Sequence, residues 1–276
     1  MDPRELRFFL DSGAYTAWST GKEIDLDEYC EFIRANIEHL DVYASLDCIP
    51  GSKDRPATPQ ERNAAAQTSW DNYCYMKDSG LDPLPVYHYG EDPKWLEQML
   101  RYGCDYIGIG GLVGIPSKLR RHWLDRVFTR LTDDAGNPII KTHGFGMTAI
   151  PLIFRYPWYS VDSTSWIKAT AAGTVYLPRT DSAGNFRFDT TPHVVPVSSG
   201  IPGASDIKSV PLITTKGAGV MKLLHRWLAE CGTDFEHASS DYYYRALCNV
   251  AFFKRISEQK TLRPFSNRLV TQRGFF

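Results

Sequence analysis

Short apolar runs alternate with longer amphipathic stretches along the chain as far as Asp162. Six of the runs have the length and composition of buried strands, and four of the stretches repeat apolar residues at helical spacing. Strands separated by helices of roughly ten or more residues pair in parallel through right-handed crossovers, so the pattern predicts an α/β protein with a parallel sheet. The predicted strands are Leu6–Leu10, Val42–Leu46, Leu84–His88, Tyr106–Ile109, Ile139–His143 and Trp158–Val161, and the predicted helices are Leu26–Ile37, Pro59–Met76, Pro93–Tyr102 and Pro116–Leu131.

The alternation changes after Asp162. Two strand-like runs surround an Ala-Gly-Asn turn in TVYLPRTDSAGNFRF, which predicts a hairpin, and a stretch rich in Pro, Ser and Gly follows it. We interpret residues 167–209 as an insertion after the sixth strand. Val210–Thr215 is the candidate seventh strand, and Gly219–Glu230 and Asp241–Ile256 have helical patterns. The last two strand-helix units are therefore expected to be modified.

The length of 276 residues fits one (β/α)8 barrel of the TIM type, which usually takes about 200 to 250 residues, so we expect residues 1–276 to form a single domain. Hydrophobic residues make up 43% of the chain, as in ordinary globular proteins. We find neither a signal peptide nor an apolar stretch long enough to span a membrane, and the six cysteines have no CxxC spacing. These features predict a cytoplasmic protein with reduced thiols and no membrane partner.

Charge is nearly balanced over the whole chain but not along it. The formal net charge is −1, which argues against a protein that coats nucleic acid without specificity. Residues 253–276 hold six basic residues and one acid, Glu258. Such a basic segment suits a phosphate backbone, and a solvated basic terminus has the same pattern.

Acidic or glycine-rich groups follow four of the predicted strands. In a (β/α)8 barrel the chemistry lies where the strands end, so these groups are expected to line one pocket. Two carboxylates beside a glycosidic carbon support a double displacement, in which one attacks C1′ and the other manages the proton of the leaving group. An Asp at such a position is also a common cap of a helix or turn. The groups are Asp11 in FFLDSGAY, Asp47 in VYASLDCIP, Gly110 and Gly111 in YIGIGGLVG, and Asp162 in WYSVDSTSW.

The ordered segments DSGAY, LDCIP, PVYHYGE, GIGGLVG, HGFGMT and SVDSTSW resemble the tRNA-guanine transglycosylase superfamily, whose members exchange guanine in nucleic acid for a 7-deazaguanine base. The resemblance covers about Phe8 to Trp166. It implies a pentosyltransferase that works by double displacement through a covalent glycosyl-aspartate.

The resemblance also implies roles for individual residues. Asp162 matches the nucleophile, Asp11 the general acid/base, and Asp47 the carboxylate that reads the N1–H and 2-amino group of the purine. Gly110 and Gly111 match the backbone amides that receive the carbonyl oxygen of the base, and Leu112 adjoins them in the base-binding set. Tyr15 and His143 match side chains that stack on the base, and His88 stands where the family has a Gln and is expected to donate one hydrogen bond.

Besides His88, the chain departs from the tRNA enzymes of the superfamily in two further ways. Those enzymes bind structural zinc through CxCxxC and a later His, which this chain lacks, and Thr16 stands where they have a Gln. We expect neither a metal nor another cofactor, because the remaining candidates match no standard zinc spacing. The compact form without zinc is most like the phage-type DNA 7-deazaguanine transglycosylases, so we expect DNA as the polymer, a 7-deazaguanine such as preQ0 as the co-substrate and, for a phage-encoded chain, the host cytoplasm as the compartment. The zinc candidates are His225, Cys231, His237 and Cys248.

Three alternatives stay open. The first is queuine-type exchange in tRNA, and the second is a non-catalytic nucleic-acid-binding partner subunit, against which the presence of both Asp11 and Asp162 argues. The third is a barrel hydrolase that acts on small glycosides or nucleosides. The inserted base, the sequence context and the oligomeric state are open as well. Charge and position suggest, as contacts to the nucleic-acid backbone, Lys168, Arg179, Lys254 and Arg255.

Overall fold

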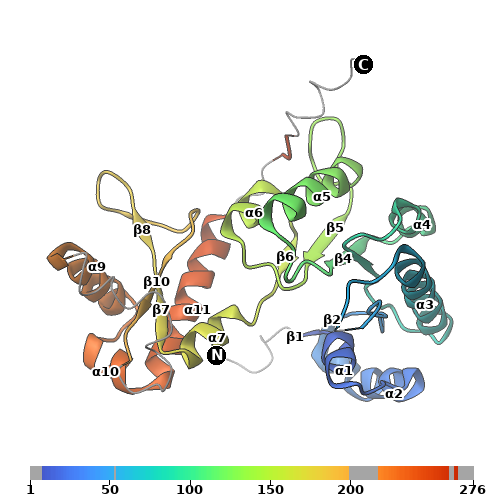
Figure 1. Ribbon diagram of the computed structural model, residues 1–276, viewed down its shortest axis with the longest axis horizontal. Helices are drawn as coiled ribbons and strands as arrows, with labels where there is room; N and C mark the ends of the chain where they lie inside the picture. The colour runs from blue at the N-terminus through green and yellow to red at the C-terminus, as the bar shows by residue number, and fades with distance from the viewer. Residues whose placement is uncertain (1–7, 53, 199–216, 261–263, 267–276) are drawn as a thin grey trace. The chain divides into compact units, whose positions relative to one another are not determined.

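A parallel sheet forms from the first six strands of the computed structural model, which describes residues 8–52, 54–198, 217–260 and 264–266 (Figure 1). A parallel bridge between Ala44 and Leu84 joins the first pair of strands to the remaining four. The predicted α/β class and parallel pairing are therefore confirmed. In order across the sheet the strands are β1 (Phe8–Leu10), β2 (Leu40–Tyr43), β3 (Val86–His88), β4 (Tyr106–Gly110), β5 (Lys141–Gly144) and β6 (Ser160–Val161).

The helices between these strands begin and end at local signals in the sequence. Thr58 and Glu61 form a capping box at the start of α3, and the Asp92 side chain accepts from the Lys94 N–H at the start of α4. Gly103, with φ of 88°, ends α4 in the left-handed conformation that glycine adopts without strain. The helices are α2 (Leu26–Asn36) with the 3₁₀ turn η2 (Ile37–His39), α3 (Pro59–Asp78), α4 (Pro93–Tyr102) and α5 (Ser117–Arg130).

Among the described residues, four short helices were not predicted. The first, α1 (Ala14–Thr20), follows β1 directly and begins at Gly13 without a capping side chain. The others are α6 (Ile150–Arg155), α7 (Ser165–Ala171) and α10 (Phe235–Ser240). Each has only six or seven residues, which is too short for a clear helical repeat of apolar positions.

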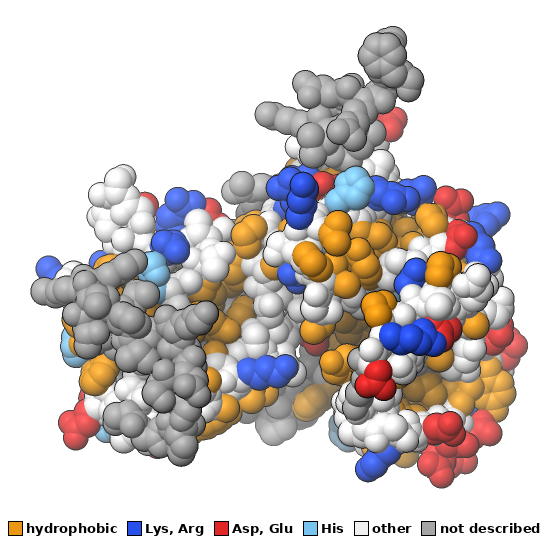
Figure 2. All heavy atoms as spheres, in the orientation of Figure 1, with side chains coloured by type: hydrophobic (Ala, Val, Ile, Leu, Met, Phe, Trp, Pro, Cys, Tyr) orange, Lys and Arg blue, Asp and Glu red, His pale blue; other side chains and the backbone are white. Residues whose placement is uncertain are grey.

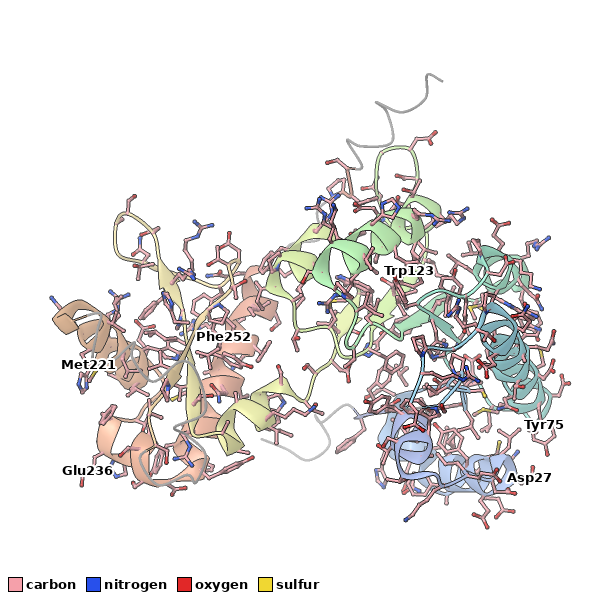
Figure 3. The ribbon with its side chains drawn as sticks, in the orientation of Figure 1. Asp27, Tyr75, Trp123, Met221, Glu236 and Phe252 are labelled. Carbon is pink, nitrogen blue, oxygen red and sulfur yellow. The ribbon has the colours of Figure 1, made fainter. Side chains whose placement is uncertain are left out.

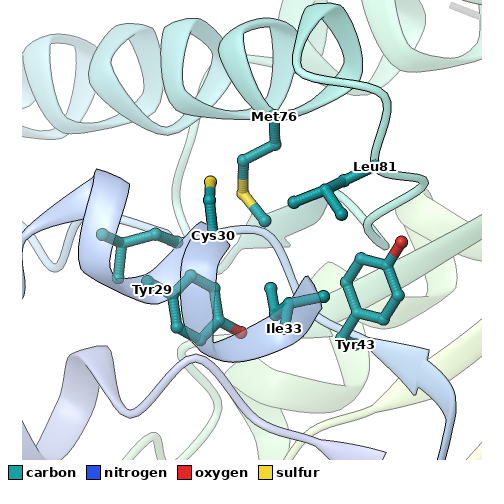
Figure 4. Close-up of a cluster of buried hydrophobic side chains, with 7 residues drawn as sticks. Tyr29, Cys30, Ile33, Tyr43, Met76 and Leu81 are labelled. Atoms are coloured by element: carbon teal, nitrogen blue, oxygen red, sulfur yellow. The ribbon is translucent and has the colours of Figure 1, made fainter. Parts of the chain in front are cut away.

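Two clusters of apolar side chains hold the parallel sheet and its helices together. On the sheet, Phe9 of β1 contacts Phe145, which directly follows β5, with ring centroids 5.8 Å apart. A side chain of β1 and a side chain that directly follows β5 therefore belong to one core. This contact requires the sheet between them to be strongly curved. The second cluster joins α2 and α3 to β2, and Figure 4 shows its buried members, which are Tyr29, Cys30, Ile33, Tyr43, Leu46, Met76 and Leu81.

The chain divides into two compact units. The first comprises Met1–Gly146, Trp158–Val161 and Pro264–Phe276, and the second comprises Met147–Pro157 and Asp162–Arg263. The single domain over residues 1–276 remains a prediction. In the described parts of the chain, no helix has both the length and the apolar character that crossing a bilayer requires.

The second unit contains antiparallel strands. The predicted hairpin is confirmed, since Arg179 pairs with Arg187 across the Ala-Gly-Asn turn. Phe252, labelled in Figure 3, packs against Tyr176 and Phe188, with ring centroids 5.6 Å apart in each pair. The candidate strand Val210–Thr215 lies outside the described residues. The remaining elements are β7 (Thr174–Leu177), β8 (Arg179–Thr180), β9 (Phe186–Arg187), β10 (His193–Pro196), α9 (Gly217–Glu230) and α11 (Tyr242–Gln259).

Candidate functional site

The backbone around Asp47 is fixed to α3 on both sides. The Asn72 side chain donates to the carbonyl of Leu46 at 2.8 Å, and the Ser69 hydroxyl accepts from the N–H of Cys48 at 2.8 Å. Ser69 is itself buried and donates to the Ala65 carbonyl one turn earlier in α3. Because the residues before and after Asp47 are both held, the carboxylate has a defined position at the carboxyl ends of the strands.

The Asp47 carboxylate belongs to a buried cluster with three other side chains. Oδ1 of Asp47 accepts from the Ser12 hydroxyl at 2.5 Å, and Oδ2 lies 2.8 Å from Nε2 of His88. The other ring nitrogen of His88, Nδ1, lies 3.0 Å from Oε1 of Glu91. The exposed fractions of the side chains are 9% for Asp47, 6% for His88 and 3% for Glu91. We call these residues, Ser12, Asp47, His88 and Glu91, the carboxylate-imidazole cluster.

Charge within the cluster favours an ionised Asp47 beside a protonated His88. Burial alone raises the pKa of the Asp47 carboxyl, but the hydrogen bond and charge of His88, with the bond from Ser12, outweigh it and hold the pKa below its usual range. Burial alone lowers the pKa of His88, but the charges and hydrogen bonds of Glu91 and Asp47 outweigh it and raise the pKa to about 10. A carboxylate of this kind accepts hydrogen bonds and does not donate them.

The glycine pair at the end of β4, with Gly110 as the last residue of the strand and Gly111 directly after it, lies against this cluster. A Cβ on Gly110 would come within 2.9 Å of Cδ2 of His88, so the absence of a side chain is required there. Gly111 has φ of 69° and its missing Cβ would lie 3.1 Å from the backbone nitrogen of Tyr89. The structure therefore brings together Asp47, His88 and the glycine pair, and both ring nitrogens of His88 face carboxylates rather than an open site. Leu112, the next residue, is buried.

Asp11 and Tyr15 both follow β1 and are exposed. Asp11 directly follows β1 and is exposed, and Tyr15 in α1 is 60% exposed. Burial, together with the charges of Asp11 and Asp47, raises the pKa of Tyr29 above its usual range, so both carboxylates act on one phenol. The indole of Trp18 donates to the Gly51 carbonyl at 3.0 Å and fixes α1 to the loop after β2.

Asp162 directly follows Val161, the last residue of β6, and is exposed. It belongs to the second unit, whereas β6 belongs to the first. Asp11, Asp47 and Asp162 thus each follow the carboxyl end of a strand, and these strands run parallel to one another in the sheet.

His143 lies in the interior of the first unit. His143 is 2% exposed. Its ring stacks on Phe9 with centroids 4.2 Å apart, and its Nδ1 lies 2.5 Å from the Ser160 hydroxyl. Phe145 contacts the ring edge-on. One ring face is therefore occupied by Phe9, and the base-stacking role implied by the resemblance remains a prediction.

The residues predicted to contact the nucleic-acid backbone are all exposed. Two of them also interact with other residues of the second unit. Arg179 donates to the Thr191 carbonyl at 2.8 Å, and Arg255 forms an ion pair with Glu258 at 3.6 Å. Lys168 and Lys254 lie on α7 and α11.

Sequence reasoning missed two sets of residues. One is Glu91, with Ser69 and Asn72, whose roles depend on tertiary contacts. The other is the basic helix α5, which begins shortly after the glycine pair and over which Lys and Arg side chains gather in Figure 2. The Lys and Arg residues in the sequence SKLRRHWLDRVFTR could have indicated this basic helix. Its exposed basic side chains are Lys118, Arg121, Arg126 and Arg130.

The residues considered for zinc do not form a site. Cys231 and Cys248 contact each other through their thiols, and both are free cysteines. In the described parts of the chain, no three His, Cys, Asp or Glu side chains lie close enough together to hold a metal ion.

A comparison with the known protein families, and with the curated proteins, matches this chain to none of them. The function proposed below is therefore based on the residues of the candidate site.

Proposed function

We propose that this protein is a base-exchange transglycosylase that replaces guanine in DNA with a 7-deazaguanine through a covalent glycosyl-aspartate. The observation that carries the proposal is the fixed Asp47 carboxylate, whose partner His88 lies against Gly110 and Gly111. A carboxylate with two oxygens matches a base edge with two neighbouring donors, as the N1–H and 2-amino group of guanine are. The finer fold that goes with the proposal is a TIM-type barrel, supported by the core shared by Phe9 and Phe145.

The reaction conserves atoms and protons over two displacements. A flipped-out nucleotide enters the site, since C1′ of a stacked base is not accessible. A carboxylate oxygen of Asp162 bonds to C1′ as the bond to guanine N9 breaks, and Asp11 supplies the proton that guanine takes away. The incoming base gives its N9 proton to Asp11 and bonds to C1′ as Asp162 leaves. Two inversions return the original anomer.

Specificity and binding fall to the other residues. Asp47 accepts from the edge of the base, and the exposed ring of Tyr15 provides a stacking surface. The basic side chains of α5 are suited to the phosphate backbone, in addition to Lys168 and Lys254.

The proposal is tested by trapping the protein on guanine-containing oligonucleotides of DNA and RNA, with a 7-deazaguanine present. Denaturing gels and mass spectrometry measure the adduct. We expect an adduct with DNA that Asp162→Asn abolishes and Asp189→Asn keeps, because Asp189 is an exposed partner of Arg187. An adduct that persists in Asp162→Asn contradicts the assignment of the nucleophile. An adduct with RNA alone identifies the tRNA alternative, and no adduct with either polymer favours the partner subunit.

A further inference from the structure

Glu91 is turned inward and holds His88 by two hydrogen bonds. Its Oε2 accepts from the backbone N–H of His88 at 3.1 Å, and its Oε1 lies 3.0 Å from Nδ1 of the ring. The Tyr87 hydroxyl donates to the Glu91 carbonyl at 3.0 Å, which fixes the backbone of Glu91 as well. Gly90, with φ of 84°, provides the turn that brings Glu91 back to His88. The imidazole is therefore fixed in position and orientation from its Glu91 side.

The two ring nitrogens face carboxylate oxygens on opposite sides. An ionised carboxylate only accepts, so where Asp47 and Glu91 are both ionised each contact requires an N–H on the ring, and the ring then carries both protons. A neutral ring would place a lone pair against an oxygen of Asp47 or Glu91. With both protons present, the cluster holds two negative charges and one positive charge, and Nε2–H points at Oδ2 of Asp47.

We propose that Glu91 is a positioning residue that acts through His88 to keep Asp47 ionised and oriented as the acceptor for guanine-type bases. The proposal rests on the function proposed above. In place of one amide that contacts the base, this chain uses a charged pair behind the base-reading carboxylate. The site consequently favours bases with two neighbouring donors over bases that present an acceptor at that edge.

The titratable groups that face His88 come from two segments. The loop after β2 contributes Asp47 and the neighbouring thiol of Cys48, and the turn after β3 contributes Glu91. From β4, Gly110 faces the ring and has no titratable group. Of these groups, Glu91 contributes a negative charge without a direct hydrogen bond to Asp47, which makes it the one to change.

The experiment compares the full-length protein with Glu91→Gln. The amide oxygen of Gln still accepts from Nδ1–H, so the size of the side chain and this contact are retained, whereas one charge and the acceptor for the His88 backbone N–H are lost. Guanine affinity is measured by calorimetry from about pH 6 to about pH 9, and the ring protonation of His88 by ¹⁵N NMR. We expect a constant affinity in the parent protein and an affinity in Glu91→Gln that falls about tenfold over this range, because His88 loses its second proton there at lower pH.

Two further variants make the result specific. Asp92→Asn removes a charge from the neighbouring exposed residue, where Asn also caps α4, and is expected to keep the parent profile. Glu91→Asp keeps the charge and is expected to restore most of the affinity at high pH.

The outcomes separate this inference from the proposed function. A doubly protonated His88 at pH 8 in the parent protein supports the inference and needs no variant, whereas a neutral ring there overturns it. Identical pH profiles for the parent and a folded Glu91→Gln also overturn it. If the parent binds no guanine at any pH, the proposed function fails, and the ¹⁵N spectra still report whether Glu91 controls His88.

Discussion

Gly110 of β4 pairs with His88 of β3, and a Cβ at Gly110 would approach Cδ2 of the His88 ring to 2.9 Å. The same Cβ would lie 3.2 Å from Cγ1 of Val86, so an added methyl group would be crowded by two side chains. His88 cannot simply move away, since Asp47 and Glu91 hold it on both sides.

This contact predicts the effect of Gly110→Ala. Relief of the overlap shifts the ring and breaks the contact from His88 to Asp47, so we expect the free energy of unfolding to fall by about 1 to 3 kcal/mol and guanine affinity to fall with it. Urea unfolding and calorimetry measure the two effects. The control is Gly219→Ala in α9, where the added Cβ meets nothing within 4 Å. An Ala at position 110 that leaves both quantities unchanged contradicts the contact.

The buried ion pair predicts how stability changes with pH. The pKa of His88 is raised to about 10, so its stabilisation is complete below the unfolded value of about 6.5 and is lost as pH rises through the folded value. The pKa of Asp47 is lowered, so its stabilisation is present above the unfolded value of about 3.9 and is lost as pH falls through the folded value.

We therefore expect the free energy of unfolding to fall by several kcal/mol from about pH 6.5 to about pH 10, and less steeply in His88→Gln, which lacks the titrating ring. Urea unfolding at a series of pH values measures this. Parallel curves for the parent and His88→Gln would show that His88 is not protonated in the folded protein.

Asp11→Asn is expected to separate proton transfer from binding. An Asn at this exposed position keeps the size of the side chain but neither gives nor takes the proton, so the exchange rate should fall by about 10²- to 10⁴-fold. Guanine affinity should stay within about twofold, because Asp47 and not Asp11 reads the base. Radiolabelled guanine exchange and calorimetry provide the two values, and a loss of affinity equal to the loss of rate would assign Asp11 to binding.

Asn249 in the second unit links α11 to β7 from a fully buried position. Its Oδ1 accepts from the Tyr176 N–H at 2.8 Å, and its Nδ2 donates to the Thr170 hydroxyl at 2.9 Å and to the Thr174 carbonyl at 3.0 Å. Asn249→Ala leaves these groups without their partner, so we expect a loss of about 2 to 4 kcal/mol in urea unfolding.

Asn36→Ala serves as the control for that change. The Asn36 side chain donates to the Phe32 carbonyl within its own helix at the protein surface, and its loss is expected to cost less than about 1 kcal/mol. Equal losses for the two variants would refute a special role for Asn249.

Much of the first unit could be predicted because its signals are local. The helix Pro93–Tyr102 has its predicted bounds, since Asp92 caps it and Gly103 ends it. The alternation of strands and helices likewise predicts the parallel pairing. By contrast, α1 begins at a glycine without a capping side chain, so no local pattern marks its start.

The candidate site could be predicted only in part. The positions of Asp47 after β2 and of Gly110 at the end of β4 follow from the sequence pattern, but the contacts of His88 do not. Glu91 is three residues from His88, and the sequence alone does not show that a glycine turn points its carboxylate inward. The burial of His143 depends on Phe9, a residue far away in the sequence, and so needed the tertiary structure.

Phe265 connects the end of the chain to its middle. Its N–H donates to the Gly136 carbonyl at 2.8 Å, and a Cβ at Gly136 would lie 2.2 Å from the Phe265 oxygen, so the two backbones touch. Between the sixth strand and this contact the chain forms most of the second unit. During synthesis, the ribosome must therefore finish nearly all of the second unit before Phe265 can reach Gly136, and a stalled ribosome would leave the first unit open at Gly136.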